Sequence, residues 1–203
     1  MVDIATQRKW DKVAPTFDLM AGRGAEIRWA PCKTELFSRM DGRVLFLALG
    51  TGLDIPLFPR GRDITAIDIS PKMLEQAKPR VDAYDGNLRA EVMDVHEMTF
   101  DDGSFDQIFT SCTFCSVPRP VEGLKSLYRV LRPGGGLYMF EHTGSRYYPF
   151  KPMMNLMTLL TEKFGPAMNR TTVDNVRAAG FEVLEVNNIF LDVVKTIVAR
   201  KPG

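Results

Sequence analysis

The sequence is poor in the features that mark a secreted, membrane-spanning or strongly charged protein. It has three cysteines in 203 residues, and this scarcity fits a reducing compartment in which disulfides are not expected. No stretch approaches the ~20 consecutive apolar residues of a spanning helix, and the N-terminus lacks the apolar core of a signal peptide. The 26 lysines and arginines nearly balance the 25 aspartates and glutamates, so no overall charge draws the chain to nucleic acid. These absences favour a cytoplasmic protein whose contact with a membrane is limited to its surface.

Metal chemistry is disfavoured on similar grounds. Cys112 and Cys115 have the spacing of a redox or metal-binding pair, but the chain has no second ligand pair and only two histidines. We therefore expect no metal site, and we expect these cysteines to line a pocket or the core.

From residue 43 onward, short apolar runs alternate with helix-like segments, which is typical of a parallel sheet flanked by helices. The length and the 45% hydrophobic content suit one α/β domain. Ser70 and Pro71 indicate the start of one helix, because serine caps helix N-termini and proline fits the first helical position. A second helix is expected over 121–131, ended by Pro133 and the three glycines that follow. The expected strands cover 43–49, 63–68, 88–93, 105–110, 136–142, 181–187 and 192–199.

Two segments depart from this alternation. Residues 1–42 precede the first strand and are expected to form a helical segment, whereas 43–203 form the α/β domain. Within that domain, 144–169 is rich in proline, methionine and aromatic residues and is too long for an ordinary connection unless it has a function. We interpret it as an insert over the substrate.

The apolar run that begins at Val44 stops at Gly50-Thr51-Gly52, and Asp68 ends the next apolar run. A buried strand, a glycine turn and an acid on the neighbouring strand form a socket for an adenosine-type cofactor. The spacing from Gly50 to Asp68 is close to the ~20 residues at which such an acid binds ribose hydroxyls. Alternatively, the turn is an ordinary connection and Asp68 caps the next helix, although Ser70 is better placed as the cap. The chain lacks the G-x-G-x-x-G spacing that places a pyrophosphate at a helix N-terminus, which disfavours a nicotinamide dehydrogenase.

Four motifs, at 47–52, 66–74, 93–95 and 131–135, resemble those of the class I S-adenosylmethionine-dependent methyltransferases. The resemblance covers roughly residues 43–200. It implies a three-layer Rossmann-like fold with a seven-stranded, mostly parallel sheet and one antiparallel strand. It also implies S-adenosylmethionine as the cofactor and S-adenosylhomocysteine as the product. The cofactor-binding residues that it implies are Phe17, Ala48, Leu49, Gly50, Thr51, Gly52, Asp68, Ile69, Met73, Asp94, Val95 and Ser111.

Within this set, the resemblance implies that Asp94 accepts the adenine amino group and that Ser111 borders the methionine moiety. Val95 is an apolar candidate for packing against the purine, and Asp94 has the alternative role of a solvated turn residue. The sequence departs from the family at Phe46, where an acid is usual, and at Ala48, where glycine is usual. These departures leave open a cofactor-binding protein without turnover.

Residues 10–18 resemble the leading segment of the methyltransferases of quinone and phospholipid biosynthesis. Within that branch, 50–58 and 140–142 most resemble bacterial phosphatidylethanolamine N-methyltransferases. The resemblance implies N-methylation of phosphatidylethanolamine, in steps toward phosphatidylcholine. A quinone-precursor methyltransferase and a small-molecule methyltransferase are the alternatives.

An ethanolamine headgroup is an ammonium at neutral pH, so it must lose a proton before its nitrogen attacks. Glu141 and His142, at the end of the fifth strand, are the candidate bases. Methylated intermediates stay cationic and suit aromatic ring faces. The candidate rings are Tyr147, Tyr148, Phe150 and Phe114, with Tyr148 expected to be the exposed one. Structural hydrogen bonding and core packing are the alternative roles for all these residues.

Arg146, Lys151 and Arg170 bracket the insert and are candidates for binding a lipid phosphate, the alternative being a solvated surface. The insert also carries an apolar face that lines either an acyl-chain groove or the core. That face comprises Met153, Met154, Leu156, Met157, Leu159, Leu160, Phe164 and Met168. Residues 4–20 mix apolar and basic side chains and suit either a membrane interface or packing on the domain. We therefore expect a peripheral protein on the inner, anionic face of the membrane; the sequence does not predict its oligomeric state.

Overall fold

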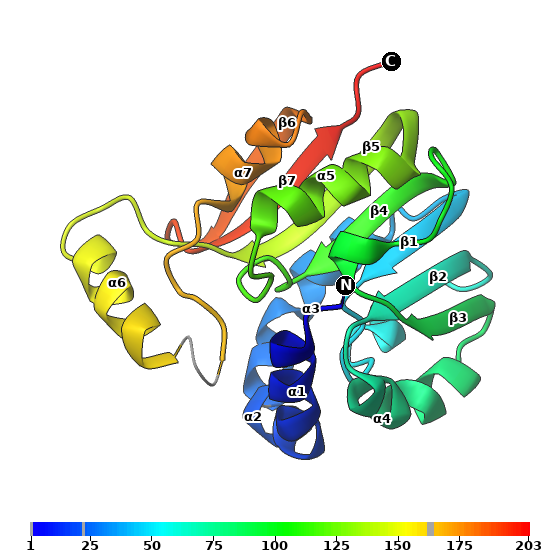
Figure 1. Cartoon of the computed structure of the whole chain (residues 1–203), viewed down its shortest axis with the longest axis horizontal. Coiled ribbons are helices and arrows are strands. Elements are labelled where there is room, and N and C mark those ends of the chain that lie inside the picture. Colours follow the sequence, from blue (N-terminus) through cyan, green and yellow to red (C-terminus); the bar gives the residue numbers. More distant parts are fainter. Residues whose placement is uncertain (1, 22, 162–164) are drawn as a thin grey trace.

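Seven strands form one sheet, and their order brings the ends of β1 and β4 side by side (Figure 1). The computed structural model describes residues 2–21, 23–161 and 165–203. The spatial order is β3-β2-β1-β4-β5-β7-β6, in which only β7 runs antiparallel to its neighbours. The strands are β1 (Arg43–Leu47), β2 (Asp63–Asp68), β3 (Asn87–Val92), β4 (Phe105–Ser111), β5 (Leu131–His142), β6 (Glu182–Phe190) and β7 (Val194–Arg200). The Rossmann-like fold expected from the sequence is confirmed.

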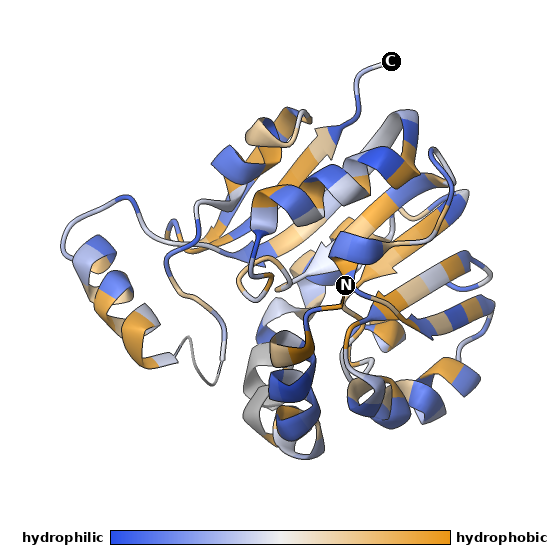
Figure 2. Cartoon of the chain, in the orientation of Figure 1, coloured by the Kyte–Doolittle hydropathy of each residue, from blue (hydrophilic) through white to orange (hydrophobic). Residues whose placement is uncertain are grey.

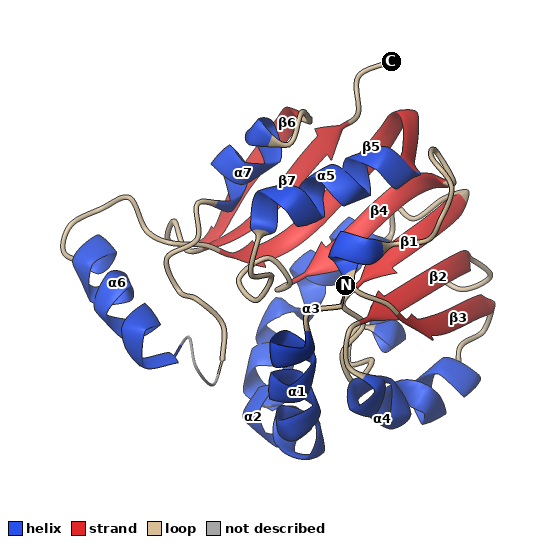
Figure 3. Cartoon of the chain, viewed as in Figure 1, coloured by secondary structure: helices blue, strands red, loops and turns tan. Residues whose placement is uncertain are grey.

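Helices cover both faces of the sheet and produce three layers (Figure 3). One face packs α5 (Pro120–Val130) and α7 (Thr172–Ala178) against the strands through a continuous apolar cluster. The other face packs α3 (Arg23–Phe37) and α4 (Pro71–Asp82), through a second cluster that holds Phe46. Figure 2 shows the strands between these layers as mostly apolar. Since the chain builds β2 and β3 on one side of β1 and β4 on the other, the topology reverses between β1 and β4. A crevice at the carboxyl ends of these two strands is where such folds bind ligands.

Local sequence signals explain the helix that follows β2. The Ser70 hydroxyl accepts a hydrogen bond from the N–H of Met73 at 3.1 Å, and Pro71 occupies the first position of α4. Serine is therefore the cap, as the sequence predicts, and the side chain of Asp68 is available for other partners.

The glycine-rich segment before β5 differs from the prediction. We expected it to separate the helix from a strand that begins at 136, but β5 begins at Leu131. The register between β4 and β5 shifts after Phe105, and Gly134 has a positive φ of 72°. Gly134 donates to the carbonyl of Lys201, and Lys201 donates to the carbonyl of Gly135. These glycines continue the strand as an irregularity because the C-terminal segment satisfies their backbone groups.

The insert folds into one helix, α6 (Phe150–Thr161), which stands away from the sheet at the left of Figure 1. Its buried residues are Met154 and Thr158. The hydroxyl of Thr158 accepts a hydrogen bond from the N–H of Met168 at 2.9 Å, which holds the returning chain to the helix. Phe164, expected on the same apolar face, lies outside the described residues.

Candidate functional site

The turn after β1 places left-handed residues at three alternate positions at the edge of the sheet. Ala48, Gly50 and Gly52 have φ angles of 58°, 59° and 81°. A Cβ on Gly50 would meet only the ring of Phe17, at 3.9 Å, whereas one on Gly52 would lie 2.8 Å from Ile55. Gly50 thus faces open space next to Phe17, and Gly52 allows close packing below the turn. Ala48 takes a left-handed φ as well, although it carries a Cβ.

Asp68 joins the end of β2 to this turn. Its Oδ2 accepts from the N–H of Gly50 and its Oδ1 from the N–H of Ser70, both at 2.8 Å. Burial raises the pKa of Asp68 to about 6, although the two N–H groups act to lower it and the charge of Asp11 adds to the rise. A carboxylate accepts about four hydrogen bonds, so Asp68 retains acceptor sites for ribose hydroxyls.

Asp94 follows β3 and is also buried. Its Oδ2 accepts from the N–H of Asp3, and its Oδ1 accepts from the N–H of His96, both at 2.9 Å. Burial acts to raise the pKa of Asp94, but these hydrogen bonds outweigh it and the pKa lies below its ordinary value. Asp94 is therefore an ionised acceptor, as a contact with an adenine amino group requires.

The N-terminal helices close over this edge of the sheet. They are α1 (Ile4–Val13) and α2 (Phe17–Ala21), joined by a 3₁₀ turn. In α1, Gln7 donates to the carbonyl of Ile69, and Asp11 accepts from the hydroxyl of Ser70 at 2.6 Å. This packing places the lead segment against its own domain, the alternative to a free membrane-interface helix.

Hydrogen bonds that the sequence did not predict also connect α2 to the glycine turn. The hydroxyl of Thr51 donates to Asp18 at 2.6 Å, and Arg80 donates to both Asp18 and the carbonyl of Thr51. Thr51 is itself buried, so its hydroxyl serves this hydrogen bond to Asp18. No sequence signal linked the three residues, because they come from separate elements.

Several residues of the predicted cofactor set point elsewhere. Leu49, Met73 and Val95 have side chains buried in the core. Val95 packs near Gly123 of α5, and its predicted place against the purine stays a prediction. Ser111 is half-buried at the end of β4, where its carbonyl accepts a hydrogen bond from the hydroxyl of Thr113. These residues can meet a cofactor through their backbone.

Glu141 organises the loop after β4. Its carboxylate is fully buried and accepts from the hydroxyl of Thr110 at 2.6 Å and from the N–H groups of Thr113 and Phe114, at 3.3 and 3.0 Å. Burial raises the pKa of Glu141 to about 7, although these hydrogen bonds act to lower it. These donors give Glu141 a structural role in ordering the loop, and its role as a base for the substrate stays a prediction.

His142 points to the opposite face of the sheet from Glu141, since side chains alternate along a strand. Its Nδ1 is buried and has no hydrogen-bond partner among the described residues. Burial lowers the pKa of His142, so its ring is neutral near pH 7 and can accept a proton. Its predicted role as the base remains a prediction.

The aromatic side chains predicted to hold a cationic substrate differ in exposure. Tyr148 is the exposed ring, at 87%, and Tyr147 is exposed at 68%. Phe114 is buried in the core under α5. Tyr148 is exposed, as the sequence predicts, and the contact of these rings with a substrate stays a prediction.

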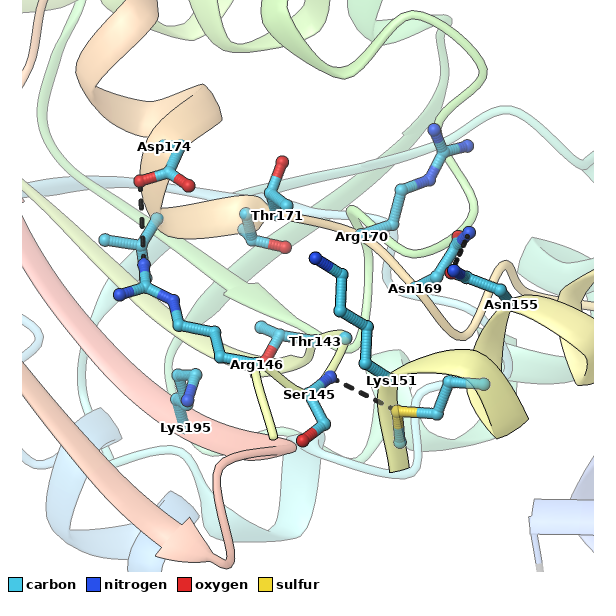
Figure 4. Close-up of a pocket in the computed structure, with 14 residues that line it drawn as sticks. Thr143, Ser145, Arg146, Lys151, Asn155, Asn169, Arg170, Thr171, Asp174 and Lys195 are labelled. Carbon is cyan, nitrogen blue, oxygen red and sulfur yellow. Dashed lines mark hydrogen bonds and ion pairs between the residues drawn. The ribbon is translucent and has the colours of Figure 1, made fainter. Parts of the chain in front are cut away.

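The predicted phosphate-binding residues do come together. Arg146, Lys151 and Arg170 line one cavity of about 130 Å³ between the insert and α7, and Lys195 of β7 joins them (Figure 4). The antiparallel pairing of β5 with β7 brings Lys195 to this cavity, a long-range relationship that no local motif could signal. The predicted binding of a phosphate here remains a prediction.

Known proteins resemble this chain in sequence and in structure. The profile of the family described as "Methyltransferase domain" matches residues 45–139. The ubiquinone/menaquinone biosynthesis C-methyltransferase of Geotalea daltonii is 32% identical over 164 residues, covering 75% of this chain and 69% of that one. The phosphatidylethanolamine N-methyltransferase of Cereibacter sphaeroides is 34% identical over 103 residues, about half of each chain.

Among solved structures, the [4+2]-cyclase SpnF superposes with a TM-score of 0.75 at 17% identity, covering 98% of this chain and 97% of that one. At this identity the likeness concerns the fold alone. One cofactor, S-adenosylmethionine, is indicated by the sequence relatives and fits the strand order, the glycine turn and the two acids Asp68 and Asp94. The chain therefore belongs to the class I S-adenosylmethionine-dependent methyltransferases.

Proposed function

We propose that this chain transfers a methyl group from S-adenosylmethionine to a ring carbon of a lipophilic quinone precursor. The observation that carries the proposal is the similarity to quinone-biosynthesis C-methyltransferases over more than two thirds of both chains. The phosphatidylethanolamine enzyme matches over half of each chain, which makes phospholipid N-methylation the second candidate.

S-Adenosylmethionine supplies an electrophilic methyl group on a sulfonium, so the protein contributes mainly alignment, which provides up to ~7–11 kcal/mol. In this proposal Asp68 accepts the ribose hydroxyls and Asp94 accepts the adenine amino group. Glu141 orders the loop after β4, and α1 and α2 exclude water from the edge of the sheet.

A ring carbon becomes a strong nucleophile when a ring hydroxyl loses its proton, and that proton needs an acceptor. His142 is the candidate, because its buried Nδ1 has no protein partner among the described residues and burial keeps the ring neutral. The same acceptor would serve an ethanolamine ammonium in the second candidate reaction. The cavity lined by Arg146, Lys151, Arg170 and Lys195 specifically favours that candidate, because the headgroup carries a phosphate.

One experiment separates the candidates. Purified chain is incubated with methyl-labelled donor and liposomes that contain either a demethylated quinone precursor or phosphatidylethanolamine, and the lipid extract is counted. Label in the quinone supports the proposal, whereas label only in the ethanolamine lipid replaces it with the second candidate.

A cofactor-binding protein without turnover is the remaining alternative, motivated by Ala48 and Phe46. Phe46 lies in the core, 4.8 Å from the ring of Phe58 between centroids, so it places no bulk in the glycine turn. Calorimetric binding of S-adenosylmethionine, combined with no label in either lipid, would favour this alternative.

A further inference from the structure

The outer surface of α6 is apolar along its whole length. Its exposed large apolar side chains recur at spacings of three and four residues, so they share one side of the helix, while Lys151, Pro152 and Asn155 are also exposed. The apolar ones are Phe150, Met153, Leu156, Met157, Leu159 and Leu160, and the two last leucines are 70% and 71% exposed. Figure 2 shows this helix outside the packed layers, where the domain does not cover it. Lys151 is the one charged residue in its sequence.

The N-terminal half of the same helix lines the cationic cavity. Lys151 extends into the cavity from α6, and Arg146, Arg170 and Lys195 line it from neighbouring segments (Figure 4). Asp174 is the one carboxylate that lines it, and Arg146 and Arg177 share that acid at 3.7 and 3.3 Å. The lining is therefore positive overall.

Two buried polar atoms in this lining lack partners among the described residues. They are Nε of Arg170 and the hydroxyl of Thr172, whose residue is 1% exposed. The guanidinium of Arg170 also donates to the carbonyl of Val117 at 3.2 Å, whereas the Thr172 hydroxyl makes no hydrogen bond within the part of the chain that the structure describes. A buried polar group without a partner is costly, so this hydroxyl supports a polar ligand at the cavity wall. The cavity volume equals that of about four water molecules, enough for a compact anionic group.

A second acid, Asp192, offsets part of this charge, since the nearby ammonium of Lys195 acts to lower its pKa. The four lysines and arginines that line the cavity still outnumber Asp174 and Asp192. Asp192 lies near the cavity, and its carboxylate accepts from the hydroxyl of Ser145 and the N–H of Arg146, both at 2.7 Å. These hydrogen bonds lower the pKa of Asp192 against the effect of burial, so the acid is ionised and fixed in the wall. The hydrogen bond from the N–H of Arg146 to Asp192 fixes the backbone that carries this arginine.

We propose that α6 docks the chain on an anionic bilayer, with its apolar side inserted among acyl chains and the cationic cavity binding a lipid phosphate. Twelve residues of helix are about 18 Å long, too short to span the ~30 Å core, so the helix lies in the interface. No described helix is long and apolar enough to cross a membrane. The exposed Tyr147 and Tyr148 beside α6 suit the headgroup level.

A bilayer is favoured over a protein partner by charge complementarity. It offers a wide apolar layer directly beneath a layer of phosphates, which matches an apolar helix side next to a cationic cavity. The docking of α6 rests on the proposed function in one respect: a lipophilic methyl acceptor would reside in the same bilayer.

The test uses vesicles of phosphatidylcholine with and without phosphatidylglycerol, which contain neither proposed acceptor. Co-sedimentation of the whole chain should require phosphatidylglycerol and weaken as salt rises. Leu159→Gln with Leu160→Gln should lower the partition coefficient at least tenfold, because two exposed leucines lose insertion. Lys151→Gln should lower it about fivefold at low salt. Since these side chains are exposed, the variants should keep the wild-type Tm.

Matched controls come from other surfaces of the chain. Leu19→Gln, at an 83% exposed leucine of α2, and Lys125→Gln, at an exposed lysine of α5, should bind like wild type. Hydrogen exchange on vesicles should slow over 150–161 and stay unchanged over 4–13. Loss of binding in Leu19→Gln with full binding by the α6 variants would overturn the proposal in favour of the lead segment.

A second copy of the chain is the other occupant to exclude. A dimer in solution whose 150–161 amides are protected without vesicles would overturn the proposal. Vesicle binding can be measured even if the chain transfers no methyl group, so failure of the proposed function does not decide the docking proposal. Methyl transfer to a water-dispersed quinone precursor by a chain that does not bind vesicles would refute the docking proposal and leave the proposed function intact.

Discussion

The carboxylate of Asp68 accepts a hydrogen bond from the N–H of Gly50, at 2.8 Å across the tips of β1 and β2. This contact joins the acid and the glycine turn that the sequence pairs by spacing. It also fixes the carboxylate before any ligand arrives, since Ser70 donates to its other oxygen. Little reorganisation is then needed when ribose hydroxyls bind.

Replacement of this acid should weaken cofactor binding. Asp68→Asn removes the charge that strengthens bonds from ribose hydroxyls, and such bonds contribute about 1.5–3 kcal/mol each. We expect the Kd for S-adenosylmethionine, measured by calorimetry, to rise at least tenfold. Asp63→Asn, at the exposed opposite end of β2, should bind the cofactor like wild type. Equal affinities in the two variants would remove Asp68 from the cofactor site.

Cofactor affinity should also depend on pH through the same residue. The pKa of Asp68 is about 6 in the folded chain, against about 4 unfolded, so this group's contribution to stability falls as pH rises between these values. Ribose hydroxyls favour the ionised form, so affinity should increase as pH rises through about 6. Calorimetry from pH 5 to 7.5 should show this increase in wild type and a flatter profile in Asp68→Asn. An affinity that decreases over this range contradicts the assignment.

The sequence could predict features whose cause is local. The apolar runs, the Ser70 cap and the spacing of Gly50 and Asp68 act within short stretches, so the sheet and the cofactor edge followed from them. The surroundings of Glu141 could not be predicted, because its donors come from another strand and loop. The same is true of Lys195, which reaches the cationic cavity through antiparallel pairing of β5 and β7.

Ala48 should be a site where glycine stabilises the fold. Its φ of 58° costs an L-residue about 1–2 kcal/mol, and Ala→Gly loses about 0.4–1 kcal/mol through the unfolded state. We expect Ala48→Gly to raise the free energy of unfolding in urea by up to about 1 kcal/mol. Ala90→Gly, within β3 and without positive φ, should lower it. Destabilisation by both variants would mean that the methyl of Ala48 contributes more packing than strain.

Glu141 should behave as a positioning residue. Glu141→Ala leaves the N–H groups of Thr113 and Phe114 buried without an acceptor, so we expect a loss of about 3 kcal/mol or more in urea unfolding. Glu141→Gln keeps one acceptor oxygen and should lose about 1 kcal/mol.

The pH dependence gives an independent check on Glu141. Its pKa is about 7 folded, above the ordinary 4.5, so the unfolded chain releases this proton first and stability falls as pH rises through this window. Glu141→Gln should reduce that fall. If Glu141→Gln instead abolished turnover while leaving stability and cofactor affinity intact, the carboxylate would be a base after all.

His142 should affect turnover without affecting the cofactor. Its neutral ring is the proposed proton acceptor, and loss of general-base catalysis typically lowers rates 10²–10⁴-fold. We expect His142→Gln to reduce kcat at least about a hundredfold, with the Kd for S-adenosylmethionine and the Tm near wild type. His96→Gln is the comparison variant: because the ring of His96 lies 2.8 Å from Asp94, it should weaken S-adenosylmethionine binding while kcat at saturating cofactor stays near wild type. A wild-type kcat in His142→Gln would remove this histidine from the proton transfer.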